Sequence, residues 1–184
     1  ILYNGEKIRI RSPSDAVKYK ISLLPEDLIN EGVLEAFTVS KNISLANLRE
    51  ISPMKFIDYS KEHDAANKFL KKYVIRASSI YEATRNLSAG NKQKVNISKW
   101  MFSDSSILIM DDPTQSLDIS SKVEIYNFMT KFTAEGGSIL FISSDFNELL
   151  GMCDRILVLK SGTIKTVFQR SEFSEKELVK ALSQ

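Results

Sequence analysis

Three uninterrupted apolar runs in the second half of the chain limit the possible fold more than any other feature. The runs are SILIM (106–110), SILFI (138–142) and RILVL (155–159). Short continuous apolar runs are typical of strands that are buried on both faces, as they are in a parallel sheet. We therefore expect an α/β fold in which helices cover a mostly parallel sheet.

A helix is predicted between the first two runs. It begins with the capping-box sequence Ser121-Lys122-Val123-Glu124 and ends at Gly136-Gly137. Its apolar residues recur at helical spacing, and they are Val123, Tyr126, Met129 and Phe132. Strand, helix and strand together form a βαβ unit, whose crossover should be right-handed.

The chain divides by sequence character into three parts. Residues 1–25 contain a predicted hairpin at Asn4-Gly5 and a short buried strand, ISLL (21–24). Residues 26–104 hold charged, helix-forming segments and no convincing strand, whereas residues 105–184 alternate between strands and helices. We expect 1–25 and 105–184 to belong to the sheet-containing core, and 26–104 to form a helical subdomain.

Composition argues against several classes of protein. The 184 residues carry a net charge of +2, which is too small to indicate a nucleic-acid or membrane-binding surface. With one cysteine (Cys153) and one histidine (His63), an internal disulfide framework is excluded and a histidine-rich metal site is disfavoured. No apolar run approaches the ~20 residues of a membrane-spanning helix. The sequence opens without a methionine, so we expect it to be part of a longer protein.

Two carboxylates follow the first apolar run directly, in Asp111-Asp112-Pro113-Thr114. Ligands of α/β sheets bind at the carboxyl ends of the strands. Asp111 could hold Mg²⁺ there, directly or through water, and Asp112 could orient an attacking water. The alternative is that Asp112-Pro113 is only a turn that ends the strand.

The stretch LSAGNKQ (87–93) precedes a predicted helix that extends to about Phe102. Ser88 and the backbone N–H groups of Gly90 and Asn91 could face a phosphate, because the N-terminus of a helix favours anions. Alternatively, Ser88 is a plain helix cap and Gly90 is present for the turn.

Taken in order, these segments resemble the nucleotide-binding domain of ABC transporters. LSAGNKQ is similar to the signature loop, ILIMDDP to the Walker B strand and Ser116-Leu117-Asp118 to the D-loop of that family. The segments PEDLINEGVL, TVSKNISL and ISSDFNELLGMCDRILVLKSGTI further resemble the monosaccharide importers for ribose, galactose and xylose, specifically the second of their two fused ATPase domains. The resemblance implies a P-loop NTPase (RecA-like) core with a mostly parallel sheet, plus a helical subdomain.

The resemblance also implies the cofactors ATP and Mg²⁺. In this family two nucleotide-binding domains stack head to tail, and each ATP lies between the P-loop of one and the signature loop of the other. Residues expected to contact the ATP of a partner domain are Ser88, Ala89, Gly90, Asn91 and Lys92. Residues expected in the other half-site are Glu26 (Q-loop), Asp111 (Mg²⁺), Asp112 (catalytic glutamate position), Ser116 and Asp118 (D-loop), and Ser144 (switch histidine position).

The sequence departs from the family pattern at several positions. Ala89 replaces a glycine of the signature loop, Asp112 a glutamate, and Ser144 a histidine, while Glu26 stands where glutamine is usual. The Walker A motif G-x-x-x-x-G-K-[ST] does not occur in the 184 residues. We therefore expect the P-loop portion to lie upstream of Ile1 and this stretch alone to be inactive.

By the same resemblance, the expected partners are a second nucleotide-binding domain, fused upstream, transmembrane permease subunits and, indirectly, a sugar-binding protein. No nucleic-acid partner is expected, and the expected location is the cytoplasmic face of the cell membrane. The alternatives are a nucleoside importer ATPase and a catalytically inactive regulatory domain. An ABC ATPase of chromosome maintenance is disfavoured, because the sequence contains no long heptad region.

Overall fold

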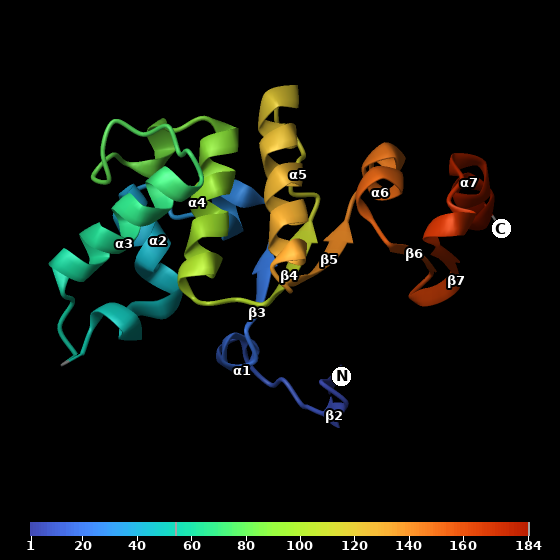
Figure 1. The fold of residues 1–184 in the computed structure, drawn as a ribbon, viewed down its shortest axis with the longest axis horizontal. Coiled ribbons are helices and arrows are strands. Elements are labelled where there is room, and N and C mark those ends of the chain that lie inside the picture. Colours follow the sequence, from blue (N-terminus) through green and yellow to red (C-terminus); the bar gives the residue numbers. More distant parts are fainter. Residues whose placement is uncertain (54, 184) are drawn as a thin grey trace. The chain divides into compact units, whose positions relative to one another are not determined.

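A computed structural model describes residues 1–53 and 55–183 (Figure 1). The chain forms two compact units, one from Ile1 to Leu140 and one from Phe141 onward. Within the described residues, no helix is both long and apolar enough to cross a lipid bilayer.

The first unit contains the sheet predicted from the first two apolar runs, but SILFI is not buried on both faces as expected, since Leu140 and Ile142 are 51% and 45% exposed. Its strands are β3 (Ile21–Leu24), β4 (Ile107–Asp111) and β5 (Ser138–Ile142), in the order β3-β4-β5, and β5 continues past the end of the unit. β3 and β4 are parallel, with Ile21 opposite Ile107 and Leu24 opposite Met110. The helix α5 (Ile119–Ala134) joins β4 to β5, so the predicted strand–helix–strand order is confirmed.

The amino-terminal hairpin is also as the sequence predicts. β1 (Leu2–Tyr3) and β2 (Glu6–Lys7) form an antiparallel hairpin, and Asn4 and Gly5 at its turn both have positive φ, 49° and 83°. This backbone is typical of a two-residue hairpin turn. The helix α1 (Pro13–Lys18) follows, with Ser12 as its cap.

Helices and turns make up residues 26–104. Their bounds are η1 (Leu28–Gly32, a π-helix), α2 (Val39–Ser44), η2 (Leu45–Ile51, a 3₁₀ segment), α3 (Tyr59–Lys72), η3 (Thr84–Asn86, a 3₁₀ turn) and α4 (Ala89–Phe102). α4 ends at Phe102, as predicted for the helix that follows the LSAGNKQ stretch. In α3 the buried residues Ala66 and Phe69 recur at helical spacing. The short elements η1 and α2 carry no such signal, because a helix of five or six residues is too short to display a period.

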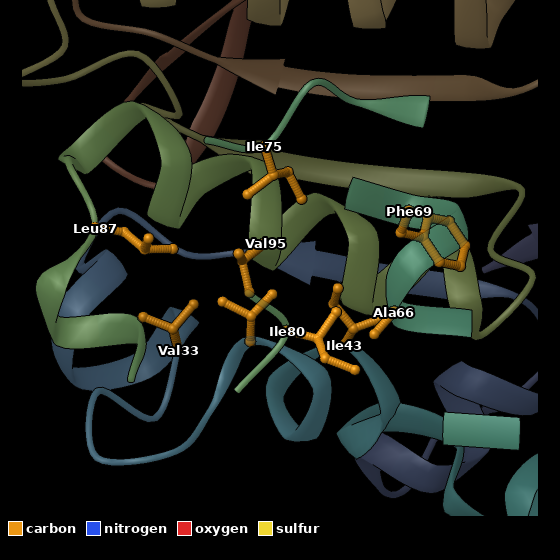
Figure 2. Close-up of a cluster of buried hydrophobic side chains, with 9 residues drawn as sticks. Val33, Ile43, Ala66, Phe69, Ile75, Ile80, Leu87 and Val95 are labelled. Carbon is orange, nitrogen blue, oxygen red and sulfur yellow. The ribbon is translucent and has the colours of Figure 1, made fainter. Parts of the chain in front are cut away.

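One hydrophobic cluster connects these helices (Figure 2). Figure 2 shows Leu87, which precedes α4, and Val95 of α4 in the same cluster as Val33 and Ile80. The other buried members are Val39, Ile43, Ala66, Phe69 and Ile75. The start of α4 is therefore anchored by Leu87, the first residue of the LSAGNKQ stretch, and by Val95, just after it.

The second unit corrects one prediction. The run 155–159 was expected to be a parallel strand buried on both faces, but β6 (Arg155–Lys160) pairs antiparallel with β7 (Thr163–Gln169). Ile156 and Val158 pack with Leu178 of α7 (Glu175–Ser183), whereas Leu159 on the opposite face is 63% exposed. A continuous apolar run does not reveal which of its faces is covered, so the prediction was wrong.

A turn signal marks this hairpin. Ser161 and Gly162 both have positive φ, 50° and 73°, as a tight hairpin turn requires. The unit also contains α6 (Phe146–Met152) and η4 (Arg170–Glu172). The tail of the chain forms α7, an amphipathic helix that buries Leu178.

Candidate functional site

The helix α4 begins at the predicted loop, and Ser88 is its cap. The Ser88 hydroxyl accepts hydrogen bonds from the backbone N–H of Asn91 (3.4 Å) and from its side-chain amide (2.9 Å). Ser88 and Ala89 are exposed, whereas Gly90 is buried. The first N–H groups of a helix have no acceptor within the helix, so the exposed tip offers donors at the positive end of the helix dipole.

Gly90 does not serve a turn, because its φ lies outside the left-handed range. A Cβ atom added at Gly90 would lie 2.3 Å from Ser121 Oγ and 2.8 Å from Ser121 Cβ, on α5. The absence of a side chain at Gly90 is what lets the two helices approach here (Figure 1). The interpretation of Gly90 as a turn residue is therefore wrong.

The next two residues of the loop make contacts within the chain. The Asn91 side-chain oxygen accepts the backbone N–H of Arg76 at 2.9 Å. The Lys92 ammonium forms an ion pair with Glu35, on the segment between η1 and α2. These two contacts orient the first turn of α4.

Asp118 caps α5, and this overturns the predicted capping box at Ser121. The helix begins at Ile119, and the Asp118 carboxylate accepts the backbone N–H of Ser121 at 2.9 Å. It also accepts the hydroxyls of Ser120 (2.6 Å) and Ser121 (2.9 Å). The Ser120 hydroxyl above all, and then the Ser121 groups, lower the pKa of Asp118 to about 2. A carboxylate outcompetes a serine as the cap because it accepts all three donors.

The two predicted carboxylates stand at the end of β4. Asp111 is the last residue of the strand, and Asp112 has a φ of +38°. Ser116 is also left-handed, with a φ of +60°. Such conformations cost non-glycine residues energy and are often found at functional sites. The Asp112-Pro113 turn therefore ends the strand and also redirects the backbone sharply.

Gln93 connects α4 to this turn. Its side-chain amide donates a 2.8 Å hydrogen bond to the carbonyl oxygen of Pro113. Glu26 approaches the same turn from the end of β3, since its carboxylate accepts a hydrogen bond from the Gln115 amide at 3.4 Å. The first unit thus brings together the Glu26, Asp112 and Asp118 segments with α4.

Ser144 belongs to the second unit. It is exposed and stands just before Asp145, the residue that caps α6. The neighbouring Ser143 hydroxyl donates to Glu148 at 2.8 Å. The second unit therefore places Ser144 at the amino end of a short helix.

Sequence reasoning missed the buried residue Asn42. Its side-chain oxygen accepts the Leu34 N–H (2.8 Å), and its amide nitrogen donates to the Leu34 carbonyl (2.9 Å) and to Thr84 Oγ1 (2.9 Å). Asn42 thereby ties the segment after η1 to the turn before the α4 loop. No sequence signal singled out Asn42, because α2 has the sequence VSKNIS and contains three other polar residues.

Two buried lysines of α4 were missed as well. Lys94 donates to the carbonyl of Val74 at 2.8 Å and pairs with Glu124 of α5 at 2.7 Å. Lys99 donates to the carbonyl of Gly32 at 2.5 Å, and burial lowers its pKa to about 8. No sequence pattern distinguishes these lysines from solvated ones, because burial of a helix face depends on its neighbours.

Comparison with known proteins decides the family. The family model described as ABC transporter matches residues 1–115. This chain belongs to the ABC transporter family. Several solved ABC structures share its fold: a nucleotide-free ATP-binding cassette from an ABC transporter superimposes with a TM-score of 0.72 at 19% identity, covering 100% of this chain and 72% of that one. An ATP-binding cassette dimer bound to ADP and phosphate gives 0.73 at 16% identity, covering 94% and 73%. The predicted α/β ABC ATPase fold is therefore confirmed.

Curated members of the family are more similar in sequence. The xylose import ATP-binding protein of Thermoanaerobacter pseudethanolicus is 40% identical over 97% of this chain and 35% of its own length. The ribose import ATP-binding protein of Rhodopirellula baltica is 35% identical, with the same coverage. The ABC chain described here thus spans about 35% of the length of these relatives.

Proposed function

We propose that this ABC chain is part of an ATP-binding component that energises import of a sugar. The observation that carries the proposal is the exposed Ser88–Ala89 tip at the start of α4, in a chain whose Asp111 and Asp118 segments follow in the family's order. The similarity to proteins named for xylose and ribose import supports a monosaccharide as the substrate class. A nucleoside importer is the alternative.

The residues at α4 fit a phosphate group. Ser88 supplies a hydroxyl, and the first turn supplies N–H groups at the positive end of the helix dipole. Ala89 is exposed, so its methyl group borders the ligand, while Gly90, Asn91 and Lys92 hold the turn in place through Ser121, Arg76 and Glu35. In the proposal, this loop binds ATP that is held by a partner domain.

The end of β4 fits a magnesium ion. Carboxylate oxygens are preferred ligands of Mg²⁺, and Asp111 is the strand's last residue. Bound Mg²⁺ would neutralise phosphate charge during hydrolysis. Asp112 would orient the attacking water, and Ser144 would lie near the γ-phosphate. Glu26, at the Q-loop position, would respond to bound nucleotide. Ser116 and Asp118 of the D-loop would contact the partner domain.

We propose further that the half-site containing Asp112 is weaker than the one served by the α4 loop. Asp112 is one methylene shorter than the usual glutamate, and its backbone is left-handed, with a φ of +38°. Ser144 lacks the ring nitrogen of a histidine. A catalytically inactive regulatory role for this half-site is the second candidate that these features favour.

The proposed function also assigns a domain division, partners and a location to this chain. The domain division is an ATPase core of 1–25 and 105–184 with a helical subdomain of 26–104. The partners would be a second, fused nucleotide-binding domain, permease subunits and a sugar-binding protein, with the chain at the cytoplasmic face of the membrane. Segments after Glu26, through about Leu48, would meet the permeases.

A charge substitution at the loop tests the proposal. Ser88→Glu places a carboxylate where phosphate is expected, so ATP hydrolysis by the protein that carries this chain should fall at least about tenfold, a cost of ~1.4 kcal/mol. Ser60→Glu is the matched control, because Ser60 is an exposed serine in the first turn of α3. Equal activity of the two variants would contradict the proposal.

A second experiment concerns the 184-residue chain alone. We expect it to bind Mg-ATP weakly and to hydrolyse none, because its sequence contains no Walker A motif. Calorimetric titration with Mg-ATP measures this directly, and tight binding would contradict the expectation. Sequencing of the gene upstream of Ile1 gives an independent check, since the proposal requires a P-loop segment there.

A further inference from the structure

The contact between Gly90 and Ser121 links two segments that the proposed function treats separately. Gly90 is in the loop assigned to the partner's ATP, and Ser121 is in the first turn of α5, directly after the Asp118 segment. Ser121 Oγ occupies the space that a side chain at Gly90 would need, at 2.3 Å from an ideal Cβ. Neither residue can shift toward the other without a collision.

Asp118 holds the Ser121 hydroxyl in that position. Its carboxylate accepts both the Ser121 hydroxyl and the Ser121 N–H at 2.9 Å. A movement of the Asp118 turn therefore carries Ser121 with it, and Ser121 meets the backbone of Gly90. The physical link is a hydrogen bond followed by a direct van der Waals contact.

Two further contacts fix the first half of α4, one to α5 and one to the turn that precedes α5. Lys94, one turn after Gly90, pairs with Glu124, one turn after Ser121, at 2.7 Å. The Lys94 side chain is 9% exposed and the Glu124 side chain 40% exposed, so the pair is partly shielded from solvent screening. Gln93 adds a bond to the Pro113 carbonyl. Together these contacts hold the amino-terminal half of α4 against α5 and against the turn that precedes α5.

We propose that Ser121 is a positioning residue that couples the Ser88–Asn91 loop to the Asp118 turn. A displacement of either segment is transmitted to the other through the side chain of Ser121. This rests on the proposed function for its purpose, because it would let nucleotide at the loop alter the surface around Asp118. The coupling itself is a property of this chain and is measurable without nucleotide.

Amide chemical shifts in the 184-residue chain test the coupling. Ser121→Val removes the hydroxyl and adds a methyl group against Gly90, so the Gly90 and Asn91 amide signals should shift. Ser120→Val is the matched control, because Ser120 also donates to Asp118 but is exposed on α5. The expected result is a severalfold larger shift for Ser121→Val, and equal shifts or none would overturn the coupling. Ser121→Ala, which keeps only Cβ, replaces the valine variant if that one does not fold.

A double-mutant cycle tests the same contact by changing Gly90 first and then Ser121. Gly90→Ala should lower the denaturation midpoint because its methyl group collides with Ser121, and adding Ser121→Gly should restore most of the loss. Independent, additive effects would overturn the proposal. In the protein that carries this chain, the same rescue should appear in the KM for ATP. Absence of ATP turnover in the unmodified protein would contradict the proposed function instead, while the nucleotide-free measurements still decide the coupling.

Discussion

The side-chain amide of Gln93 donates a 2.8 Å hydrogen bond to the backbone carbonyl of Pro113. This bond joins the helix that begins at the candidate phosphate loop to the turn that ends the Asp111-Asp112 strand. Gln93 is buried, so the bond is shielded from water. It makes the geometry of the two segments interdependent.

Gln93→Glu should destabilise the chain by about 2–4 kcal/mol near neutral pH, because it buries a carboxylate against a carbonyl oxygen. The pKa of the new carboxyl should be raised in the folded state. The loss relative to the unmodified chain should therefore shrink as the pH is lowered toward about 4. Urea unfolding at several pH values measures it, with Asn127→Asp on the exposed face of α5 as control. A loss that does not depend on pH would contradict the assignment of the buried bond.

Asn42→Leu should cost about 2–4 kcal/mol of unfolding free energy, because Leu34 and Thr84 lose hydrogen-bond partners in a buried site. Equilibrium unfolding gives the value. Asn67→Leu is the control, since Asn67 is exposed on α3 in the same unit. Similar losses for both variants would mean that the Asn42 network does not stabilise the fold.

Lys99 should give a pH-dependent contribution to stability. Burial lowers the pKa of Lys99 from 10.5 to about 8, so the unfolded chain binds the proton more tightly between these values. The stability of the unmodified chain should therefore rise relative to Lys99→Met as the pH increases from 8 to 10.5, by up to about 3 kcal/mol. Unfolding measurements on both proteins provide the difference, and Lys68→Met at an exposed position of α3 is the control. A flat difference would show that the Lys99 ammonium is not desolvated.

Asp118 should make a contribution to the stability of the fold that depends on pH in the acidic range. Its pKa is lowered from 3.8 to about 2 by the serine hydroxyls and the Ser121 N–H, so its contribution is present above 3.8 and is lost as the pH falls toward 2. The stability difference between the unmodified chain and Asp118→Asn should be smaller at about pH 3 than at about pH 6. Ser120→Ala should raise the pKa of Asp118, which a carboxyl-carbon NMR titration detects. An unchanged titration would contradict the hydrogen bond from the Ser120 hydroxyl to Asp118.

Much of the fold follows from local patterns in the sequence. The apolar runs at β3 and β4 and the helical periodicity of α3 each fix an element by its own residues. The cap at Ser88 is likewise local. The β6–β7 hairpin is different, because the same apolar run suits a parallel or an antiparallel partner, and only tertiary packing against Leu178 decides which face is covered.

In the candidate site, too, some features follow from local sequence and others depend on tertiary contacts. The order of Ser88, Asp111 and Asp118 along the chain predicts the family. The contacts that position them depend on residues far apart in sequence, such as Gly90 with Ser121 and Gln93 with Pro113. A sequence pattern contains no distance between α4 and α5, so it could not predict that Gly90 is needed for helix packing.

The most direct test of the account is ATP hydrolysis by the protein that carries this chain, measured for the Ser88→Glu and Ser60→Glu variants at equal concentrations. The account predicts that Ser88→Glu loses at least about tenfold in rate, a barrier increase of ~1.4 kcal/mol, while Ser60→Glu retains the rate of the unmodified protein. If the Ser88→Glu variant hydrolyses ATP as fast as the Ser60→Glu variant, the loop at the start of α4 does not bind the phosphate of ATP, and the central claim is wrong.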